Sequence, residues 1–341
     1  MTVARGVWVL GEQRNGRIHP VSYELLAWGR ALADDLHVYL ECVMVGTGIT
    51  AAAKSLIAHG ADRVRCLEHS ELLTFRVDPY ARIVESLVRE HQPEILLAAA
   101  TTMGRTLMPV LAAHLHTGLT ADCTGLSIDP NERLLLQTRP AIGGNVLATI
   151  KTPEHRPQMA TVHPKARRPL AADPSRVGEI VVETIDESLL GSRVLRLGFE
   201  EDLTMASSLQ DAELIVAGGR GLRTAKRFSD LFEIAAHLGG VVGASRCAVD
   251  LGWASHAHQV GLSGKSVSPT TYIALGISGS PNHLAGMSSA ERVIAINSDA
   301  DAPIFQVADV GLVADLADLL PRWLDRLRAR KRRDGQGGLG G

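Results

Sequence analysis

The sequence predicts an α/β protein with two doubly wound domains, the C-terminal one built around a ligand-binding parallel sheet. The chain has 341 residues, more than one hydrophobic core usually serves, so two domains are expected. Only 4% of the residues are aromatic while 45% are hydrophobic, so Ala, Val, Leu and Ile must fill the core. Such aliphatic runs are typical of buried parallel strands, and here they alternate with helical segments in both halves.

The first half alternates strand-like and helix-like segments from its beginning. Leu25, Leu32 and Leu36 recur at helical spacing, and Asp78-Pro79 is a helix-start signal with Asp78 as the expected N-cap. This alternation predicts a parallel sheet with helices on both faces. The predicted strands are 6–10, 38–45, 63–67 and 94–99, and the predicted helices are 22–36, 50–59 and 78–91.

Beyond residue 126 the pattern changes to short β-rich runs separated by turn residues such as Gly143-Gly144. We expect these runs to be antiparallel strands that extend the sheet, followed by one more strand. The antiparallel runs are 134–138, 146–150 and 158–162, and the further strand is 177–185.

A second alternating series begins at residue 213 and predicts another doubly wound sheet. Glycine-rich turns follow its strands, at the carboxyl ends where open α/β sheets bind ligands. The predicted strands are 213–217, 241–242, 271–275 and 292–296, and the predicted helices are 225–238 and 315–330.

These elements define the expected domain boundaries. Residues 1–207 form the N-terminal α/β domain and include a polar connection from residue 188 to 210, and residues 208–330 form the second domain. The tail, 331–341, is basic and then glycine-rich, a composition that predicts disorder.

The bulk composition excludes several classes of protein. A net charge of −2 gives no overall attraction to nucleic acid or membranes, and no apolar run is long enough to cross a bilayer. The first strand begins almost at Met1 and leaves no room for a presequence. None of the four cysteines, Cys42, Cys66, Cys123 and Cys247, stands in a CxxC pair, so we expect no metal site and buried, reduced thiols. A cytoplasmic protein is expected.

Three loops between Gly243 and His283 carry the strongest functional signal. Each is rich in small residues, lies beside an apolar strand-like run, and contains hydroxyl, amide or basic side chains. Glycine lets backbone N–H groups approach a bound anion, because no Cβ intervenes. The loops therefore suit a cofactor that carries phosphate and a polar ring system.

The order of these blocks resembles the alpha subunit of electron-transfer flavoproteins, in its prokaryotic form. The resemblance covers nearly the whole chain, from Pro93–Arg105 and Thr117–Cys123 through Gln137–Asn145 to Pro157–Val162. It is strongest from Ala217-Gly-Gly-Arg-Gly221 to Val313-Ala-Asp-Leu316. It implies that the second domain binds FAD and that the first, a nucleotide-hydrolase-like sheet, contacts a partner.

The family's FAD contacts carry over to the positions where the motifs match. The resemblance implies a flavin-site arginine, a strand-end Ser-Arg pair, a loop after a glutamine, a loop that closes on the cofactor, and an adenosine end. In that order these are Arg220; Ser245 and Arg246; Gln259, Val260, Gly261, Leu262 and Ser263; Ser278, Gly279, Ser280, Pro281, Asn282 and His283; and Asn297, Asp315 and Leu316.

Two departures from the family pattern affect redox tuning more than FAD binding. The family usually has Gln-Thr at Leu262-Ser263 and often Ile-Gln-His at Pro281-Asn282-His283. The resemblance and charge logic make His283 and Arg246 the candidate cation or donor near the flavin N1 and O2, and Ser263 the candidate near N5. The Ser278–Ser280 turn, ahead of a helix start at Pro281, could donate N–H groups to the pyrophosphate.

The resemblance implies a heterodimer with a beta subunit that carries electrons from acyl-CoA or other dehydrogenases to a quinone-linked or other acceptor, as in fatty acid β-oxidation. Electron-bifurcating members hold a second FAD mainly in the beta subunit, so this chain leaves that alternative open. An NAD(P)-linked oxidoreductase is a second alternative, but no Gly-x-Gly-x-x-Gly turn follows the first strand. A structural partner with a decayed FAD site is a third, and the intact Ser245, Arg246 and His283 argue against it.

Overall fold

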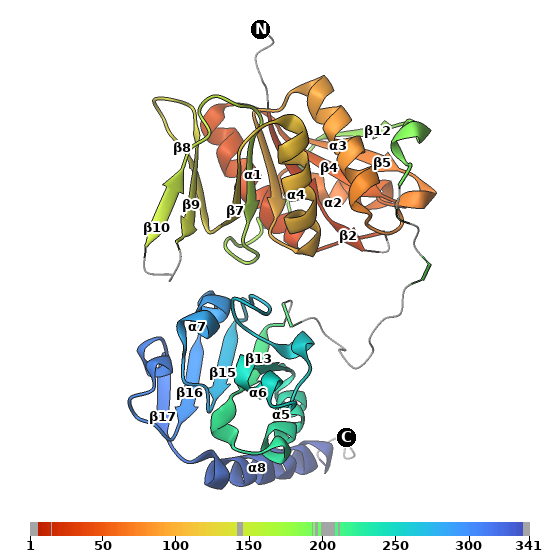
Figure 1. Ribbon diagram of the computed structural model, residues 1–341. Coiled ribbons are helices and arrows are strands. Elements are labelled where there is room, and N and C mark those ends of the chain that lie inside the picture. The colour runs from red at the N-terminus through yellow and green to blue at the C-terminus, as the bar shows by residue number, and fades with distance from the viewer. Residues whose placement is uncertain are drawn as a thin grey trace. The chain divides into compact units, whose positions relative to one another are not determined.

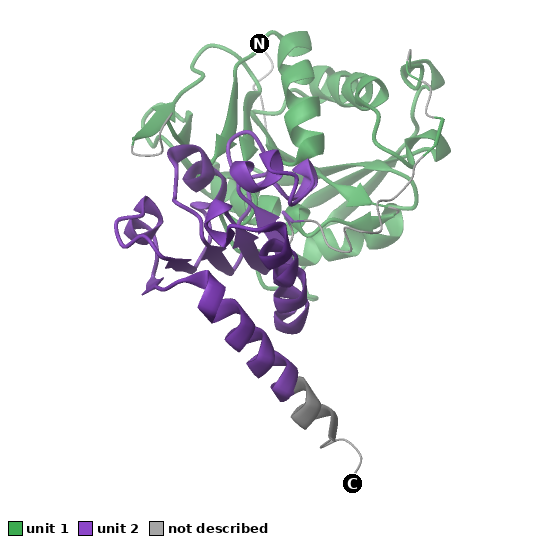
Figure 2. Ribbon diagram, turned by 60° about the horizontal axis from the view of Figure 1, so that its bottom comes forward, with its two compact units in different colours: residues 1–198 green, residues 199–341 purple. Residues whose placement is uncertain are grey.

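The computed structural model describes the chain except for residues 1–5, 15, 142–145, 193, 195–196, 199–208, 211 and 337–341, with side chains up to residue 330 in the last helix. The chain divides into two compact units, residues 1–198 and 199–341 (Figures 1 and 2). The predicted turn at Gly143-Gly144, the end of the tail and most of the polar connection lie outside the described residues.

Unit 1 is built on a seven-stranded sheet in which every neighbouring pair is parallel. Its central strand carries apolar side chains on both faces: Val7 and Val9 join one core and Trp8 and Leu10 the other. This explains the continuous apolar run, because both faces of the strand are covered. In spatial order the strands are β12 (Glu179–Glu183), β5 (Arg63–Glu68), β4 (Leu40–Gly46), β1 (Val7–Gly11), β6 (Ile95–Ala99), β11 (Gln158–Val162) and β7 (Leu119–Cys123).

Helices cover both faces of this sheet, as the alternation predicts. One core contains the apolar faces of the first two helices and the other those of the third and fourth. The helices are α1 (Val21–Leu36), α2 (Ala53–Ala58), α3 (Val77–His91) and α4 (Thr102–Leu115), with short 3₁₀ turns η1 (Thr50–Ala52), η2 (Ser70–Leu72) and η3 (Glu187–Leu189).

Three local expectations in unit 1 need correction. Segment 158–162 is not antiparallel: β11 lies parallel between β6 and β7, because all five of its residues are buried and fit a sheet interior. Asp78 does not cap α3, which begins one residue earlier with Arg76 at the N-cap. Helix α4 is absent from the predicted elements because Gly104 and Pro109 interrupt its helical pattern.

The expected antiparallel strands form a separate sheet instead of extending the main one. It contains β8 (Gly125–Ile128), β9 (Leu135–Pro140) and β10 (Leu147–Ile150), in the order β10-β9-β8. A two-stranded ribbon, β2 (Gln13–Arg14) with β3 (Arg17–Ile18), follows the first strand.

Unit 2 is a second doubly wound layer with five parallel strands in the order β14-β13-β15-β16-β17. Two apolar cores cover the two faces of its sheet. The strands are β13 (Leu214–Gly218), β14 (Val241–Ala244), β15 (Thr271–Leu275), β16 (Val293–Asn297) and β17 (Val310–Val313). The helices are α5 (Ala225–Leu238), α6 (Arg246–Asp250), α7 (Pro281–Met287) and α8 (Leu316–Gln336), with 3₁₀ turns η4 (Arg220–Leu222), η5 (His256–His258) and η6 (Pro303–Gln306).

The ends of unit 2 differ from the expectation in two ways. The edge strand β17 was not predicted, because its four residues are exposed and too few to show a pattern. Helix α8 continues past residue 330 to Gln336, so the segment expected to be disordered begins as helix. Helix-forming Arg and Lys residues extend it without an apolar face to mark its length.

Candidate functional site

The topology of unit 2 creates a switch point between two neighbouring strands. From β13 the chain crosses to β14 on one side, whereas β15 and its successors continue on the other. The carboxyl ends of β13 and β15 lie in register, with Gly218 opposite Leu275. The chain runs on to opposite sides of the sheet after these two ends, and such a position is where open α/β sheets hold ligands.

A cavity of about 480 Å³ lies at this switch point. Residues from five segments line it, at the ends of β13, β14, β15 and β16 and around residue 260. The lining residues are Arg220, Gly221, Arg223, Ser245, Arg246, Cys247, Val260, Gly261, Ser263, Gly276, Ile277, Ser278, Ser280, Asn282, His283, Asn297 and Asp299.

Two glycines allow the loops after β13 and β15 to touch backbone to backbone. Gly276 has φ +64°, and a Cβ there would meet the Gly221 backbone at 2.8 Å. A Cβ on Gly221 would in turn meet the Gly276 Cα at 2.7 Å. Glycine is therefore required at both positions, and the contact brings the two loops together at the cavity wall.

The loop after β15 offers donors for an anion. Within the described part of the chain, the backbone N–H groups of Ser278, Gly279 and Ser280 donate no hydrogen bond. Helix α7 begins directly after them at Pro281. Consecutive unbonded N–H groups are a binding element for phosphate, as the sequence predicts for the Ser278–Ser280 turn.

Arginines stand at the rim of the cavity rather than inside it. The Arg246 side chain is 69% exposed, with its Nε 3.5 Å from Oδ2 of Asp250. Arg223 contacts Asp315 at 3.1 Å, and Arg220 is exposed. Guanidinium groups bind phosphate well, but exposed charges are screened by water and salt.

His283 is one of two buried polar residues that line the cavity, and Asn297 is the other. The His283 side chain is 5% exposed, and its Nε2 lies 3.0 Å from the Tyr272 hydroxyl. Burial lowers the pKa of His283 to about 4, against a smaller opposing effect of the Val260 carbonyl. Burial also raises the pKa of the Tyr272 hydroxyl, which therefore keeps its proton.

These pKa shifts change the expected role of the histidine. With this pKa the ring of His283 is neutral at pH 7, so in this structure it is a hydrogen-bond donor or acceptor and not a cation. Its Nδ1 is buried and, apart from the Val260 backbone, has no hydrogen-bond partner among the described residues. An unpartnered buried nitrogen on a cavity wall is suited to a polar ligand atom.

The other predicted site residues divide into two groups. The cavity brings together Arg220, Ser245, Arg246, Val260, Gly261, Ser263, Ser278, Ser280, Asn282, His283 and Asn297. Gln259, Leu262, Gly279, Pro281, Asp315 and Leu316 do not line it.

Some residues of the second group make contacts outside the cavity lining. Gln259 donates from Nε2 to the Ser263 hydroxyl at 3.0 Å. Asp315 accepts from the Ala317 N–H and caps α8, while the Leu316 side chain is buried in the core. The Leu262 side chain is 72% exposed.

Sequence reasoning omitted six lining residues. They are Gly221, Arg223, Cys247, Gly276, Ile277 and Asp299, and three of them, Gly221, Cys247 and Ile277, stand directly beside a predicted residue. Cys247 is exposed, which contradicts the expectation of four buried thiols, whereas Cys42, Cys66 and Cys123 are buried. It stands in the first turn of α6 beside the exposed Arg246, and this neighbour was the signal for its exposure.

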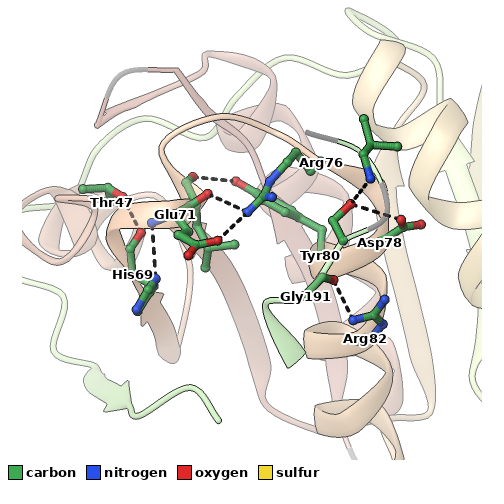
Figure 3. Close-up of polar contacts among 11 residues, drawn as sticks. Thr47, His69, Glu71, Arg76, Asp78, Tyr80, Arg82 and Gly191 are labelled. Atoms are coloured by element: carbon green, nitrogen blue, oxygen red, sulfur yellow. Dashed lines mark hydrogen bonds and ion pairs between the residues drawn. The ribbon is translucent and has the colours of Figure 1, made fainter. Parts of the chain in front are cut away.

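A second cavity, about 490 Å³, lies in unit 1 near the ends of β4 and β5. Figure 3 shows its polar contacts: Arg76 bonds Glu71 at 3.0 Å, and the His69 Nδ1 accepts from the Glu71 N–H. Because these charged groups already bind one another, the cavity offers no distinct ligand chemistry. Among the described residues, no cluster of His, Cys, Asp and Glu could hold a metal ion, and no helix has the length and apolarity to cross a bilayer.

Comparison with known proteins identifies the family domain that each half of the chain matches. The electron transfer flavoprotein domain matches residues 7–188, and the electron transfer flavoprotein FAD-binding domain matches residues 208–288. The electron transfer flavoprotein subunit alpha of Thermoanaerobacterium thermosaccharolyticum is 44% identical over 329 residues, 96% of this chain and 99% of its own. That of Clostridium acetobutylicum is 44% identical over 328 residues, 95% and 97% of the two chains.

A further relative is the acryloyl-CoA reductase electron transfer subunit beta of Anaerotignum propionicum, 36% identical over 359 residues and covering 96% of each chain. The cavity fits FAD on its own geometry: unbonded N–H groups suit the pyrophosphate, and the buried, unpartnered Nδ1 suits a polar atom of the ring. This chain therefore belongs to the alpha subunits of the electron transfer flavoproteins, which bind FAD and transfer electrons.

Proposed function

We propose that this chain is the FAD-holding subunit of a heterodimer with a beta subunit, and that the pair carries electrons from acyl-CoA or other dehydrogenases to a quinone-linked acceptor. The observation that carries the proposal is the switch-point cavity, with neutral donors inside and arginines at its rim. FAD, when bound, supplies the one- and two-electron chemistry. The cytoplasmic location expected from the sequence stays a prediction.

The residues of the cavity support a carrier rather than an enzyme acting on its own substrate. The Ser263 hydroxyl accepts from Gln259, the Ser245 hydroxyl accepts from the Ala248 N–H, and the His283 Nε2 is bound to Tyr272. A nucleophile needs a base within hydrogen-bond reach. Among the described residues of the cavity, no serine or cysteine side chain is hydrogen-bonded to His283.

In this proposal each group of residues has a separate task. The N–H groups of Ser278, Gly279 and Ser280 bind the pyrophosphate, with Arg220 and Arg223 as the charged partners. His283 and Ser263 contact the polar edge of the flavin, and they do so as neutral groups. Neutral donors stabilise negative charge on a reduced ring without holding it as tightly as a cation would.

The test is purification of the chain with its co-expressed beta subunit. We expect a yellow complex with one FAD assigned to unit 2, and poor behaviour of the single chain in size exclusion. Two FAD per heterodimer would support the bifurcating alternative instead. A colourless complex that takes up no FAD, or a stable FAD-loaded monomer, would contradict the proposal.

A matched pair of glycine variants tests whether FAD binds in this cavity. Gly276→Ala places a Cβ 2.8 Å from the Gly221 backbone and should abolish FAD binding, while Gly239→Ala has the same positive φ but no atom within 4 Å. In both variants an alanine must adopt a positive φ, which costs about 1–2 kcal/mol. The Gly239→Ala control therefore separates this backbone strain from the effect of the Cβ clash at Gly276. Equal FAD affinity in the two variants would show that the cofactor binds elsewhere.

A further inference from the structure

A buried tyrosine outside the cavity lining is hydrogen-bonded to His283. Tyr272 lies in β15 with its side chain fully buried, and His283 lies in the first turn of α7. The Tyr272 hydroxyl and the His283 Nε2 are 3.0 Å apart, and the ring centroids are 6.1 Å apart with an angle of 59° between the rings. Of the two residues, only His283 lines the cavity. The hydrogen bond therefore connects Tyr272 to the site through the histidine.

The direction of this hydrogen bond follows from the protons that each partner has. The Tyr272 hydroxyl keeps its proton at pH 7, because burial raises its pKa. In the described part of the chain it makes one hydrogen bond, the one to His283. If it accepted from an Nε2–H group, its own proton would be buried without an acceptor, which is unfavourable. The Tyr272 hydroxyl is therefore the donor, and the His283 Nε2 is the acceptor.

The surroundings of the other ring nitrogen lead to the same conclusion. The His283 ring also contacts the Val260 backbone, and because Nε2 is bonded to Tyr272 this contact involves Nδ1. The Val260 N–H already donates to the Ala244 carbonyl at 2.9 Å, so the group left for Nδ1 is the Val260 carbonyl, which is an acceptor. An acceptor beside Nδ1 favours a proton on this nitrogen. The neutral ring has one proton, and both neighbours favour its position on Nδ1.

The protein holds the resulting N–H group only weakly. Nδ1 makes no hydrogen bond of normal geometry among the described residues. Asn297, the other buried polar residue of the lining, is different: its Nδ2 donates to the Ile277 carbonyl at 3.0 Å, and its Oδ1 accepts from the Asp299 N–H at 3.1 Å. Of these two lining residues, His283 is therefore the one with a donor left for a ligand atom.

We propose that Tyr272 is a positioning residue that fixes the proton of His283 on Nδ1 and thereby makes the histidine a hydrogen-bond donor to the flavin. This inference rests on the proposed function, because it requires FAD in the cavity. With its proton on Nε2, the same ring would present a lone pair from Nδ1 and would repel negative charge on the flavin. A donor that is fixed in advance stabilises the charge gained on reduction. Tyr272 therefore sets the sign of the effect of His283 on the reduction potential.

The first measurement locates the proton of His283. The chain is labelled with ¹⁵N-histidine, co-expressed with its beta subunit, and studied by NMR at pH 7 with FAD bound and with FAD removed. A protonated ring nitrogen and an acceptor nitrogen differ strongly in chemical shift, and the spectrum of His283→Ala assigns the signals of this ring. We expect the proton on Nδ1 in both forms, and intermediate shifts for both nitrogens in Tyr272→Phe. A proton on Nε2 in the unmodified complex would overturn the proposal.

The second measurement is a double-mutant cycle on the one-electron reduction potential of bound FAD. Loss of one neutral hydrogen bond changes an equilibrium constant about 2- to 12-fold, so His283→Ala should lower the potential by about 20–65 mV, at about 59 mV per tenfold change. Tyr272→Phe should lower it too, by no more than His283→Ala does. The double variant should have the potential of His283→Ala alone, because Tyr272 acts through the histidine.

The control variant is Tyr80→Phe. Tyr80 is a buried tyrosine of unit 1 whose hydroxyl donates to the Val45 and Leu72 carbonyls, so the variant loses comparable hydrogen bonds and should keep the potential. The proposal is overturned by an unchanged potential in Tyr272→Phe, by an equal fall in Tyr80→Phe, or by a double variant with a lower potential than His283→Ala. A complex that takes up no FAD would contradict the proposed function instead, and the position of the His283 proton would still test the role of Tyr272.

Discussion

The buried histidine makes unit 2 sensitive to mild acid. His283 has a pKa of about 4 in the folded protein, against about 6.5 when exposed. Between these values the unfolded state binds more protons, so stability rises with pH there. The contribution is fully present above about pH 6.5 and is lost as the pH falls toward 4; from pH 7 to pH 5 the loss is about 2 kcal/mol.

The variant His283→Gln removes this proton binding while it keeps a polar side chain in the site. We expect the free energy of unfolding of unit 2 to fall by about 2 kcal/mol more in the unmodified protein than in the variant between pH 7 and pH 5. Oxidation of Met287 by hydrogen peroxide in increasing urea is a suitable assay. Met287 lies in α7 with His283 and is fully buried, so it reacts when unit 2 unfolds.

The control variant is His155→Gln, which replaces an exposed histidine of unit 1 and should leave the pH dependence of Met287 oxidation unchanged. The ring signals of His283 in an NMR titration give an independent value of its pKa. The reasoning is refuted if His283→Gln and the unmodified protein lose the same stability between pH 7 and pH 5, or if the ring titrates near 6.5.

Three further predictions concern the same cavity. His283→Ala should lower the one-electron reduction potential of bound FAD by about 20–65 mV, which is the effect of one neutral hydrogen bond. If a spectroelectrochemical titration shows no change in potential while FAD stays bound, the role of His283 is structural. Tyr272→Phe should destabilise unit 2 by about 1–3 kcal/mol in the Met287 assay, because the buried Nε2 of His283 loses its partner. Cys247 should react with iodoacetamide in FAD-free protein and be protected in the FAD-loaded complex, as peptide mass spectrometry can show. Equal labelling of the two forms would show that the cofactor does not cover the cavity wall at Cys247.

The sequence was most informative where the pattern is local. Helix Ala225–Leu238 and strand Thr271–Leu275 match their predicted bounds, because one has a clear helical period and a capping Thr224 and the other is a short β-branched run between turns. The direction of β11 could not be predicted in this way. Whether a short apolar strand pairs parallel or antiparallel depends on partners some sixty residues away, here β6.

The candidate site, like the fold, could be predicted from the sequence only in part. Glycine-rich loops after parallel strands predict a ligand at the carboxyl edge, and most of the predicted residues do line one cavity. What the sequence could not supply is the environment of each side chain. Nothing around His283 in the chain indicates that it would be buried with Tyr272, eleven residues earlier, as its hydrogen-bond partner, or that Leu316 would turn into the core.

The arrangement of charge in the cavity separates binding from redox tuning. The cations, Arg220, Arg223 and Arg246, stand at the exposed rim, where water and salt weaken their effect on a ring deeper in the site. The buried His283 side chain and the loop N–H donors are neutral dipoles, which carry no net charge for salt to screen. Phosphate affinity should therefore vary with salt while the flavin potential stays constant. A carrier needs this combination, because its potential must remain between those of donor and acceptor in every complex that it forms.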